Sequence, residues 1–522
     1  MPVADDELVN RNTNPVYPSQ KMRRVGAAAA AGVACGAAYH ALVEDLRRLP
    51  AYAWCAEALA MPLLRRLDAE QAHGLAVQAA ALGLAPLAPP LPPGAAAALA
   101  TRACGLHFRN PIGLAAGFDK QAEAMAGLLD AGFGFVEVGT VTPQPQAGNA
   151  QPRMFRLPED GAVINRFGFN SVGGAAVAAR LAEYWGPLSR RGVEPGGAHA
   201  GRGLVGVNLG KNKEGEAEAD YVAGVLGLAP FADYVTINIS SPNTPGLRAL
   251  QGRAQLQSLL TAVKRARDSI PWGVPRPRDP AELAEAQPQA VLARALASRR
   301  AAPPPLLVKI APDLTEADLV DIAAVVKACG IDGIIVSNTT LARPSTLAAE
   351  PALAAQTGGL SGQPLFAAST RVLARMHVLT EGRVPLIGVG GVSNAEQAYD
   401  KIKAGATLVQ VYTALAYSSA CLCVRARSVC VLHAQPVCAA LPSISLTLLS
   451  LAALPPSPSL SLSLSPSLSL LSFTHPTGPA LIPRINAGLA ELLAKDGYTS
   501  VAQAVGKEAV SKWGGGTPLK SS

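Results

Sequence analysis

The stretch Tyr234–Arg248 reads YVTINISSPNTPGLR and passes from a strand pattern into a polar loop. Its first part alternates β-branched with polar residues, which is the period-two pattern of a β-strand. Its second part contains two prolines, one glycine and a dense group of uncharged polar side chains, which predicts a loop. Because α/β enzymes display reactive side chains on loops that follow strands, this loop is a candidate site. A plain Ser/Asn-rich turn is the alternative.

Strand and helix patterns alternate on both sides of this stretch. Eight apolar strands separated by helices predict an α/β fold, a closed parallel (β/α)8 TIM barrel. The candidate strands are Ile112–Gly117, Phe135–Val141, Leu204–Leu209, Tyr234–Ser240, Leu306–Ala311, Gly333–Asn338, Leu386–Val392 and Leu408–Thr413. The candidate helices are Gln121–Asp130, Gln255–Asp268, Glu316–Cys329, Ala367–Leu379 and Ala395–Lys403.

Polar or glycine-rich segments follow most of these strands, and Lys309 lies within the fifth. In a barrel the carboxyl ends of all strands meet at one face, so we expect these segments to form one site. Small residues would let a flat ligand approach the backbone. Glycines after strands 7 and 8 are typical of a phosphate site. The segments are AAGFDK (115–120), GT (139–140), NLGKN (208–212), SNTT (337–340), GGLSG (358–362), GVGG (388–391) and YT (412–413).

The composition of the 522-residue chain excludes several classes of protein. Hydrophobic residues make up 49%, enough for a large core. The net charge of +8 comes from scattered lysines and arginines without a basic run, so we expect no nucleic acid partner. The eight cysteines include no CxxC pair, which indicates neither a zinc site nor a secreted disulfide framework. We therefore expect no metal.

Two segments precede the barrel. Residues 1–45 contain an Arg-led, Ala-rich run after Met22, predicted to be a targeting segment with a marginal transmembrane anchor. The run is short for a span, which needs about 20 apolar residues, so a secretory signal or an Ala-rich helix without an address stays open. Residues 46–93 predict a small N-terminal helical domain, with Asp68 capping a helix over Ala69–Leu82. This domain would lie on a membrane surface or pack on the barrel as a lid.

The chain resembles the quinone-linked, membrane-associated class of dihydroorotate dehydrogenases over Leu67–Leu415 and Gly478–Val505. The resemblance implies that the barrel, residues 100–417 plus 478–510, binds FMN and oxidises dihydroorotate to orotate in pyrimidine biosynthesis. It further implies ubiquinone as the final electron acceptor and the mitochondrial inner membrane as the location. The motifs that carry it are NPIGLAAGFDK, GFGFVEVGTVTPQPQ, RLPEDGAVINRFGFNS, GVNLGKNK, NISSPNTPGLR, VKIAPD, SNTT, GGLSGQPL, IGVGGV and LVQVYTAL.

The resemblance also implies a role for individual residues. Ser241 matches the base that removes a proton from the substrate, and Thr244 and Phe169 match the residues around its proton relay. The matches to substrate ligands are Lys120, Asn165, Asn238, Asn243, Asn338 and Thr339. The matches to FMN contacts are Ala116, Gly117, Lys120, Thr140, Asn165, Asn208, Asn238, Lys309, Ser337, Ser361, Gly362, Gly390, Gly391, Tyr412 and Thr413. The matches to polar groups of the quinone tunnel are His73, Arg156 and Tyr412.

Three other functions stay open at this point. The soluble class of the family, which uses fumarate or NAD, carries a cysteine where this chain has Ser241. A 2-hydroxyacid oxidase would also be an FMN barrel, but it requires an inward His/Arg pair that the sequence lacks. A non-catalytic remnant or scaffold is the alternative outside enzymes.

Residues 418–477 interrupt the resemblance. They contain half of the cysteines, no acidic residue and the tract PSPSLSLSLSPSLSLL. Pro and Ser break each apolar run before the roughly 20 residues of a membrane span, and the cysteine spacing suits no common zinc pattern. Such low complexity predicts disorder, or a retained intron or gene-model artefact. A milder insertion at Pro271–Pro305 predicts a surface loop with a short helix from Asp279.

If residues 418–477 are an artefact, a transcript that joins Tyr417 to Gly478 exists. Sequencing of cDNA across this junction checks the expectation. Peptides from residues 441–471 in the purified native protein would contradict it.

Overall fold

Eight parallel strands close into a barrel in the computed structural model, which describes residues 45–49, 52, 60–189, 191, 193, 195, 203–274, 288–300, 302–417 and 481–516. The strand order around the barrel is β10-β12-β13-β3-β4-β7-β8-β9, and β13 pairs with β3 to close it. The predicted (β/α)8 barrel is confirmed. The strands are β3 (Ile112–Leu114), β4 (Phe135–Val141), β7 (Leu204–Leu209), β8 (Tyr234–Asn238), β9 (Leu306–Ile310), β10 (Gly333–Val336), β12 (Leu386–Val389) and β13 (Leu408–Val411).

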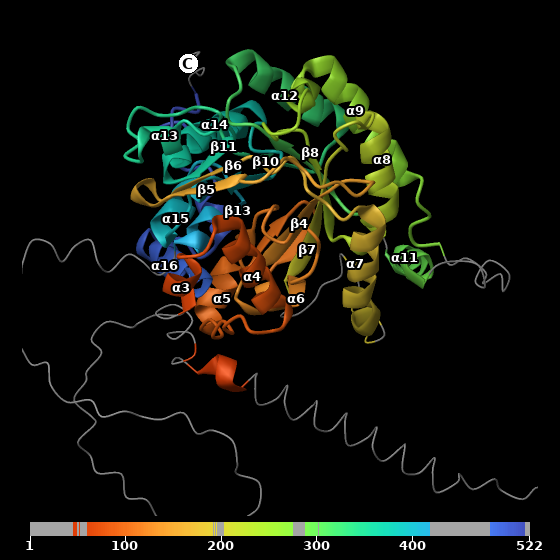
Figure 1. Ribbon diagram of the computed structural model, residues 1–522, viewed down its shortest axis with the longest axis horizontal. Helices are drawn as coiled ribbons and strands as arrows, with labels where there is room; N and C mark the ends of the chain where they lie inside the picture. Colours follow the sequence, from red (N-terminus) through yellow and green to blue (C-terminus); the bar gives the residue numbers. More distant parts are fainter. Residues whose placement is uncertain are drawn as a thin grey trace, which may run out of the picture.

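Helices surround the barrel (Figure 1). The last long helix, α16 (Leu481–Lys495), packs against α15 (Ala395–Lys403) and against α5 (Pro93–Leu99), which comes from the other end of the chain. The other outer helices are α6 (Met125–Asp130), α7 (Gly174–Ser189), α8 (Ala217–Leu228), α9 (Arg253–Asp268), α11 (Pro288–Arg299), α12 (Glu316–Cys329), α14 (Phe366–Leu379) and α17 (Val501–Ala504).

One predicted helix begins later than expected, and one further helix was not predicted. Helix α6 begins at Met125 and not at Gln121, because the Asp119 carboxylate accepts the backbone N–H groups of Glu123 and Ala124 and holds a turn there. Ala122 lies in the left-handed region at φ 57°, which no α-helix contains. The insertion before β9 carries α11 (Pro288–Arg299), whereas the helix expected from Asp279 lies outside the described residues.

Each end of the barrel carries a small antiparallel sheet. The hairpin β1 (Thr101–Ala103) and β2 (Leu106–Phe108) covers the amino-terminal end, where the Phe108 ring lies 5.2 Å from that of Phe135 inside the barrel. The sheet β5-β6-β11 belongs to the opposite end and consists of β5 (Met154–Leu157), β6 (Ala162–Asn165) and β11 (Gly359–Gly362). Hydrophobic packing therefore closes one end, while polar loops gather at the other.

The predicted helix after Asp68 is α4 (Ala69–Ala81), preceded by the short α3 (Met61–Leu64). The Asp68 carboxylate accepts the N–H groups of Glu70 and Gln71 and so caps α4. Glu70 forms a 2.7 Å ion pair with Arg153, which joins α4 to the loop before β5. The N-terminal helices thus pack on the barrel.

Some predictions concern residues outside the described part. Residues 1–44 and 418–480 are among these, so the targeting segment and the low-complexity insertion stay predictions. Within the described residues, no helix combines the length and apolar character needed to cross a bilayer.

The interior of the barrel allows a test of its packing. An added Cβ at Gly206 would lie 2.1 Å from the ring of buried Tyr234, whereas one at Gly227 on α8 would meet nothing within 4 Å. Overpacking of this kind costs about 1–3 kcal/mol, so Gly206→Ala should lower the melting temperature. Gly227→Ala is the control and should leave stability unchanged or raise it by up to ~1 kcal/mol. Equal melting temperatures of the two variants would show that the barrel interior tolerates the added methyl.

Candidate functional site

Three amide and hydroxyl side chains from adjacent strands meet inside the open end of the barrel. Asn208 Oδ1 at the end of β7 accepts hydrogen bonds from Thr140 Oγ1 (2.6 Å) on β4 and from Asn238 Nδ2 (3.0 Å) on β8. All three side chains are buried. The stretch that ends β8 therefore forms the centre of a polar layer, as the sequence predicted.

The layer continues to the end of β10. Ser240 Oγ donates to Asn238 Oδ1 (2.9 Å), and Asn338 Nδ2 donates to Ser240 Oγ (3.0 Å). Thr339 packs against the backbone of Gly359 on β11, where an added Cβ would approach its hydroxyl. Four strand ends thus share one hydrogen-bonded network.

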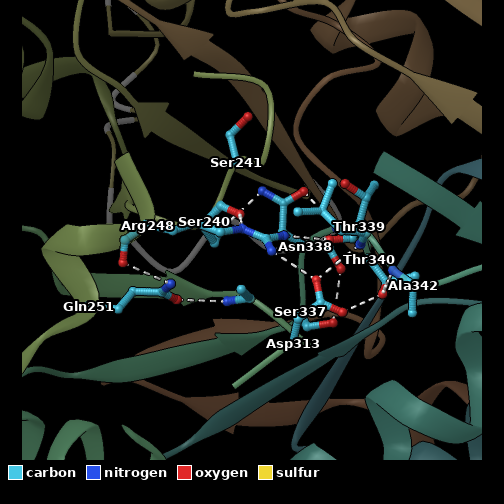
Figure 2. A network of polar contacts seen from close by, with 12 residues as sticks. Ser240, Ser241, Arg248, Gln251, Asp313, Ser337, Asn338, Thr339, Thr340 and Ala342 are labelled. Carbon is cyan, nitrogen blue, oxygen red and sulfur yellow. Dashed lines mark hydrogen bonds and ion pairs between the residues drawn. The ribbon is translucent and has the colours of Figure 1, made fainter. Parts of the chain in front are cut away.

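The Ser241 loop lies over this layer. Ser241 is 6% exposed and its Oγ accepts the backbone N–H of Asn243 (3.3 Å). Asn243 Nδ2 in turn donates to the Asn165 carbonyl (3.1 Å) at the end of β6. Thr244, in the same turn, has a buried hydroxyl that finds no hydrogen-bond partner among the described residues. Figure 2 shows the Ser241 side chain directed away from the network that holds the base of its loop.

That network depends on Arg248, which the sequence analysis did not single out. Its guanidinium donates to the carbonyls of Ser240 (3.0 Å) and Thr339 (2.9 Å) and pairs with Asp313 (2.8 Å), as Figure 2 shows. Three loops, after β8, β9 and β10, are tied together by this one side chain. The motifs NISSPNTPGLR and VKIAPD gave a sequence signal for this contact, because each of them ends in a charged residue, Arg248 or Asp313.

Two lysines, the half-buried Lys120 and the buried Lys309, supply positive charge to the site. Lys120 Nζ lies 4.0 Å from the centroid of the Phe167 ring, and burial lowers the pKa of Lys120 to about 8 against the opposing charge of Glu70. Lys309 on β9 is 5% exposed, and among the described residues it has neither a hydrogen bond nor an ion pair. Burial lowers the pKa of Lys309 as well, and the charge of Glu137 opposes that shift.

A glycine-rich loop packs its backbone against the amino end of α14. Gly390 and Gly391, after β12, have φ values of 110° and 77°, and an added Cβ at Gly391 would lie 2.5 Å from Phe366, the first residue of α14. Thr413 Oγ1 donates to Ser361 Oγ (2.9 Å) beside Gly362 on β11. Free backbone N–H groups at a helix N-terminus bind anions, so this loop suits a phosphate.

The remaining predicted flavin contacts lie between these features. The Tyr412 hydroxyl donates to the Gly117 carbonyl (3.0 Å) next to Ala116, and so joins the end of β13 to that of β3. Ser337 is buried at the end of β10. Phe169, at φ 57°, packs its ring against Gly210 after β7.

The predicted quinone residues are only partly brought together. His73 on α4 lies 5.0 Å from the Phe118 ring and 6.2 Å from the Tyr412 ring, measured between centroids. Burial, together with the charge of Lys120, lowers the pKa of His73 to about 3, so its imidazole is neutral at physiological pH. Arg156 on β5 instead donates to the Leu67 carbonyl before α4, and within the described chain it bonds to neither His73 nor Tyr412.

An acidic residue within the barrel also escaped the sequence analysis. Glu137 on β4 is fully buried and accepts hydrogen bonds from Asn208, Tyr234 and Gln410. The signal was present in the strand FVEVGTV, because a charge in the middle of an apolar strand must find partners inside the fold. No cluster of three potential metal ligands occurs among the described residues.

The chain is similar to proteins of one family. The family described as Dihydroorotate dehydrogenase matches residues 98–428. The mitochondrial dihydroorotate dehydrogenase (quinone) of Oryza sativa subsp. japonica is 44% identical over 94% of this chain and 88% of its own length. The mouse protein of the same name (Mus musculus) is 49% identical over 68% of this chain and 81% of its own length. The Eimeria tenella DHODH crystal structure in complex with ferulenol is 36% identical, covers 84% of this chain and 96% of its own, and has a TM-score of 0.64.

The partly buried imidazole of His73 predicts a dependence of stability on pH. Its folded pKa of about 3 lies below the ordinary imidazole pKa of 6.5, so the unfolded chain binds the proton more tightly. The stabilising contribution is therefore complete above pH 6.5 and is lost as the pH falls toward 3. As the pH falls through that window, the free energy of unfolding of His73→Gln should decrease by about 1.4 kcal/mol less per pH unit than that of the wild type.

Urea unfolding at pH 5 and pH 7 measures the difference. His107→Gln, on the exposed face of β2, is the matched control and should follow the wild type. Identical pH slopes for His73→Gln and the wild type would contradict the expectation.

Proposed function

The chain belongs to the dihydroorotate dehydrogenase family, and from that premise we propose how its barrel carries out the reaction. It oxidises dihydroorotate to orotate, a step of pyrimidine biosynthesis, and passes the electrons to a quinone. The enzymes of this family depend on a flavin. The identity of the flavin, the roles of single residues and the membrane location are our proposals.

We infer that the flavin is FMN. The glycine loop at the amino end of α14 suits a single phosphate, because Gly390 and Gly391 bring the loop backbone so close to Phe366 and Ser369 that an added Cβ would collide with them. Lys309 is buried and has no hydrogen bond or ion pair within the part of the chain that the structure describes, and its positive charge would stabilise the negative charge of a reduced flavin. When bound, the flavin accepts the hydride from C6 of the substrate.

The residues proposed to hold FMN come from the ends of all eight barrel strands and from β6 and β11. Hydrogen bonds such as those of Thr413 with Ser361 and of Tyr412 with Gly117 support a preformed surface. The proposed contacts are Ala116, Gly117, Lys120, Thr140, Asn165, Asn208, Asn238, Lys309, Ser337, Ser361, Gly362, Gly390, Gly391, Tyr412 and Thr413.

Neutral amides and one cation are proposed to bind the substrate. A dihydropyrimidine ring offers alternating N–H and C=O groups, which amides match as both donors and acceptors. The half-buried Lys120 supplies a positive charge for the carboxylate, and its pKa of about 8 leaves it protonated at neutral pH. The proposed ligands are Lys120, Asn165, Asn238, Asn243, Asn338 and Thr339.

Ser241 is proposed to take the proton from C5. The supporting observation is the Thr244 hydroxyl, which is buried in the same turn without a partner among the described residues. A buried hydroxyl of this kind suits a water molecule that carries the proton from Ser241 outward, with the Phe169 ring shielding it. A serine is a weak base on its own and needs such a relay.

The second half-reaction is proposed to use the space between α4 and the barrel. His73, Phe118 and Tyr412 form an aromatic cluster there, and Arg156 lies near the start of α4. Ubiquinone would approach along this side. Exposed leucines on and around α3 and α4 support contact with a membrane surface, since together they present apolar area to solvent. They are Leu46, Leu49, Leu63, Leu67, Leu75, Leu82 and Leu84.

We propose the mitochondrial inner membrane as the location. The Oryza sativa, Arabidopsis thaliana and mouse relatives are named mitochondrial. The bacterial relative from Cereibacter sphaeroides, 49% identical over 71% of this chain, carries no such word in its name. An Arg-led segment after Met22 supports organellar targeting.

Replacement of Ser241 by Ala tests the proposed base. General base catalysis contributes about 10²–10⁴-fold, so dihydroorotate-driven reduction of a soluble ubiquinone analogue should slow by that factor. The flavin absorbance and orotate binding should stay as in the wild type. Fumarate as the sole acceptor should support no turnover.

Ser240→Ala is the matched control. It removes the hydrogen bonds of the Ser240 hydroxyl with Asn238 and Asn338, and it should slow turnover by no more than about thirtyfold, the effect of about two hydrogen bonds. Equal rates for Ser241→Ala and the wild type would refute the base. Turnover with fumarate would refute the quinone-linked class, and a purified protein that is not yellow would favour the non-catalytic alternative.

A further inference from the structure

Glu137 has a hydrogen-bonding arrangement that only an acceptor can satisfy. Its side chain is fully buried in the middle of β4. Asn208 Nδ2 on β7 (2.7 Å), Gln410 Nε2 on β13 (2.7 Å) and the Tyr234 hydroxyl on β8 (3.0 Å) all donate to its two oxygens. A carboxylate accepts and never donates, so each neighbour must turn its hydrogen toward Glu137.

The orientation of the Gln410 side chain shows how strongly Glu137 requires a hydrogen-bond donor from its neighbours. Its amide nitrogen points to Glu137, and its Oε1 is left buried without a hydrogen-bond partner among the described residues. An unpaired buried oxygen costs free energy. The amide keeps this orientation because turning it would place two oxygens face to face.

The same requirement fixes the orientation of the Asn208 amide. Asn208 in turn fixes the orientation of the next amide toward the open end of the barrel. Because Asn208 donates its Nδ2 to Glu137, its Oδ1 faces the open end and accepts from Thr140 and Asn238. Asn238 must then donate with Nδ2, which turns its Oδ1 toward Ser240 Oγ and Asn338 Nδ2. Each amide in this series has an NH2 group that donates and an oxygen that accepts. Once the Asn208 NH2 group is fixed by Glu137, the orientation of each following amide is fixed as well.

We propose that Glu137 is a positioning residue that sets, through Asn208 and Asn238, the donor and acceptor directions of the amides that bind dihydroorotate. The inference rests on the proposed function, which makes Asn238 and Asn338 substrate ligands. Glu137 lies in register with Gly206 and, through it, with Tyr234 at the start of β8, so it lies deeper in the barrel than Asn238 at the end of that strand. Its contribution is to preorganise hydrogen bonds that a neutral amide at this position would leave free to reverse.

Glu137→Gln tests the proposal with almost no change in shape. A glutamine can offer either a donor or an acceptor to Asn208. The amides of Asn208 and Asn238 would then no longer be held in one orientation. The dissociation constant of orotate, measured from the absorbance of the oxidised flavin, should rise about tenfold, which is the loss of about one hydrogen bond. The KM for dihydroorotate should rise by a similar factor, with kcat within about threefold of the wild type.

Tyr234→Phe is the matched control. It removes one donor to Glu137 and leaves the carboxylate, so orotate affinity should stay within about threefold of the wild type. If Glu137 acted only through packing and stability, Glu137→Gln would bind orotate as tightly as Tyr234→Phe. That result would overturn the proposal.

A second variant covers the case in which Glu137→Gln does not fold. Glu137→Asp keeps a group that only accepts, so orotate should bind to it within about fivefold of the wild type. A tenfold loss in Glu137→Asp or in Tyr234→Phe, with flavin content and melting temperature retained, would contradict the proposal. If the flavin-loaded wild type failed to bind orotate, the proposed function would fail, whatever the variants showed.

Discussion

The pairing of β13 with β3 closes the sheet, and the site depends on that closure. Val409, Gln410 and Val411 lie in register with the first barrel strand, although about 300 residues separate the partners along the chain. Without this pairing, Gln410 would not reach Glu137 and Tyr412 would not reach Gly117. Closure places all eight carboxyl ends around one space. Side chains from distant parts of the sequence become neighbours there.

The interior of the closed barrel is apolar at its amino-terminal end and polar toward its open, carboxyl end. Phe135, Leu204 and Tyr234 pack with the β1–β2 hairpin at the amino-terminal end. Above them lie Glu137 and the amides of the site. Water is excluded below, so each polar group in the layer must find its partner within the protein. This requirement makes the orientation of each amide depend on the next one, and the site is rigid because of it.

Burial also sets the charge states at the open end. It lowers the pKa of Lys120 to about 8 and that of His73 to about 3, in both cases as the largest cause. The charge states at neutral pH differ, because the ordinary pKa of a lysine ammonium is 10.5 and that of an imidazole is 6.5. Lys120 therefore remains a cation at neutral pH, while His73 becomes an uncharged ring packed against Phe118. Burial thus opposes the charge of both groups, and only the imidazole loses its charge at neutral pH.

Much of the architecture could be predicted from the sequence, since it depends on local patterns. Alternating apolar strands and helices determined the barrel, and the loop after β8 determined the position of Ser241 among neutral amides. The start of α6 could not be predicted, because the Asp119 side chain holds the turn before it. Only the tertiary structure decided that Glu137, Gln410 and Arg248 belong to the site. Their importance comes from partners on other strands, and a hydrogen bond between segments that are distant in sequence leaves no period or spacing in the chain.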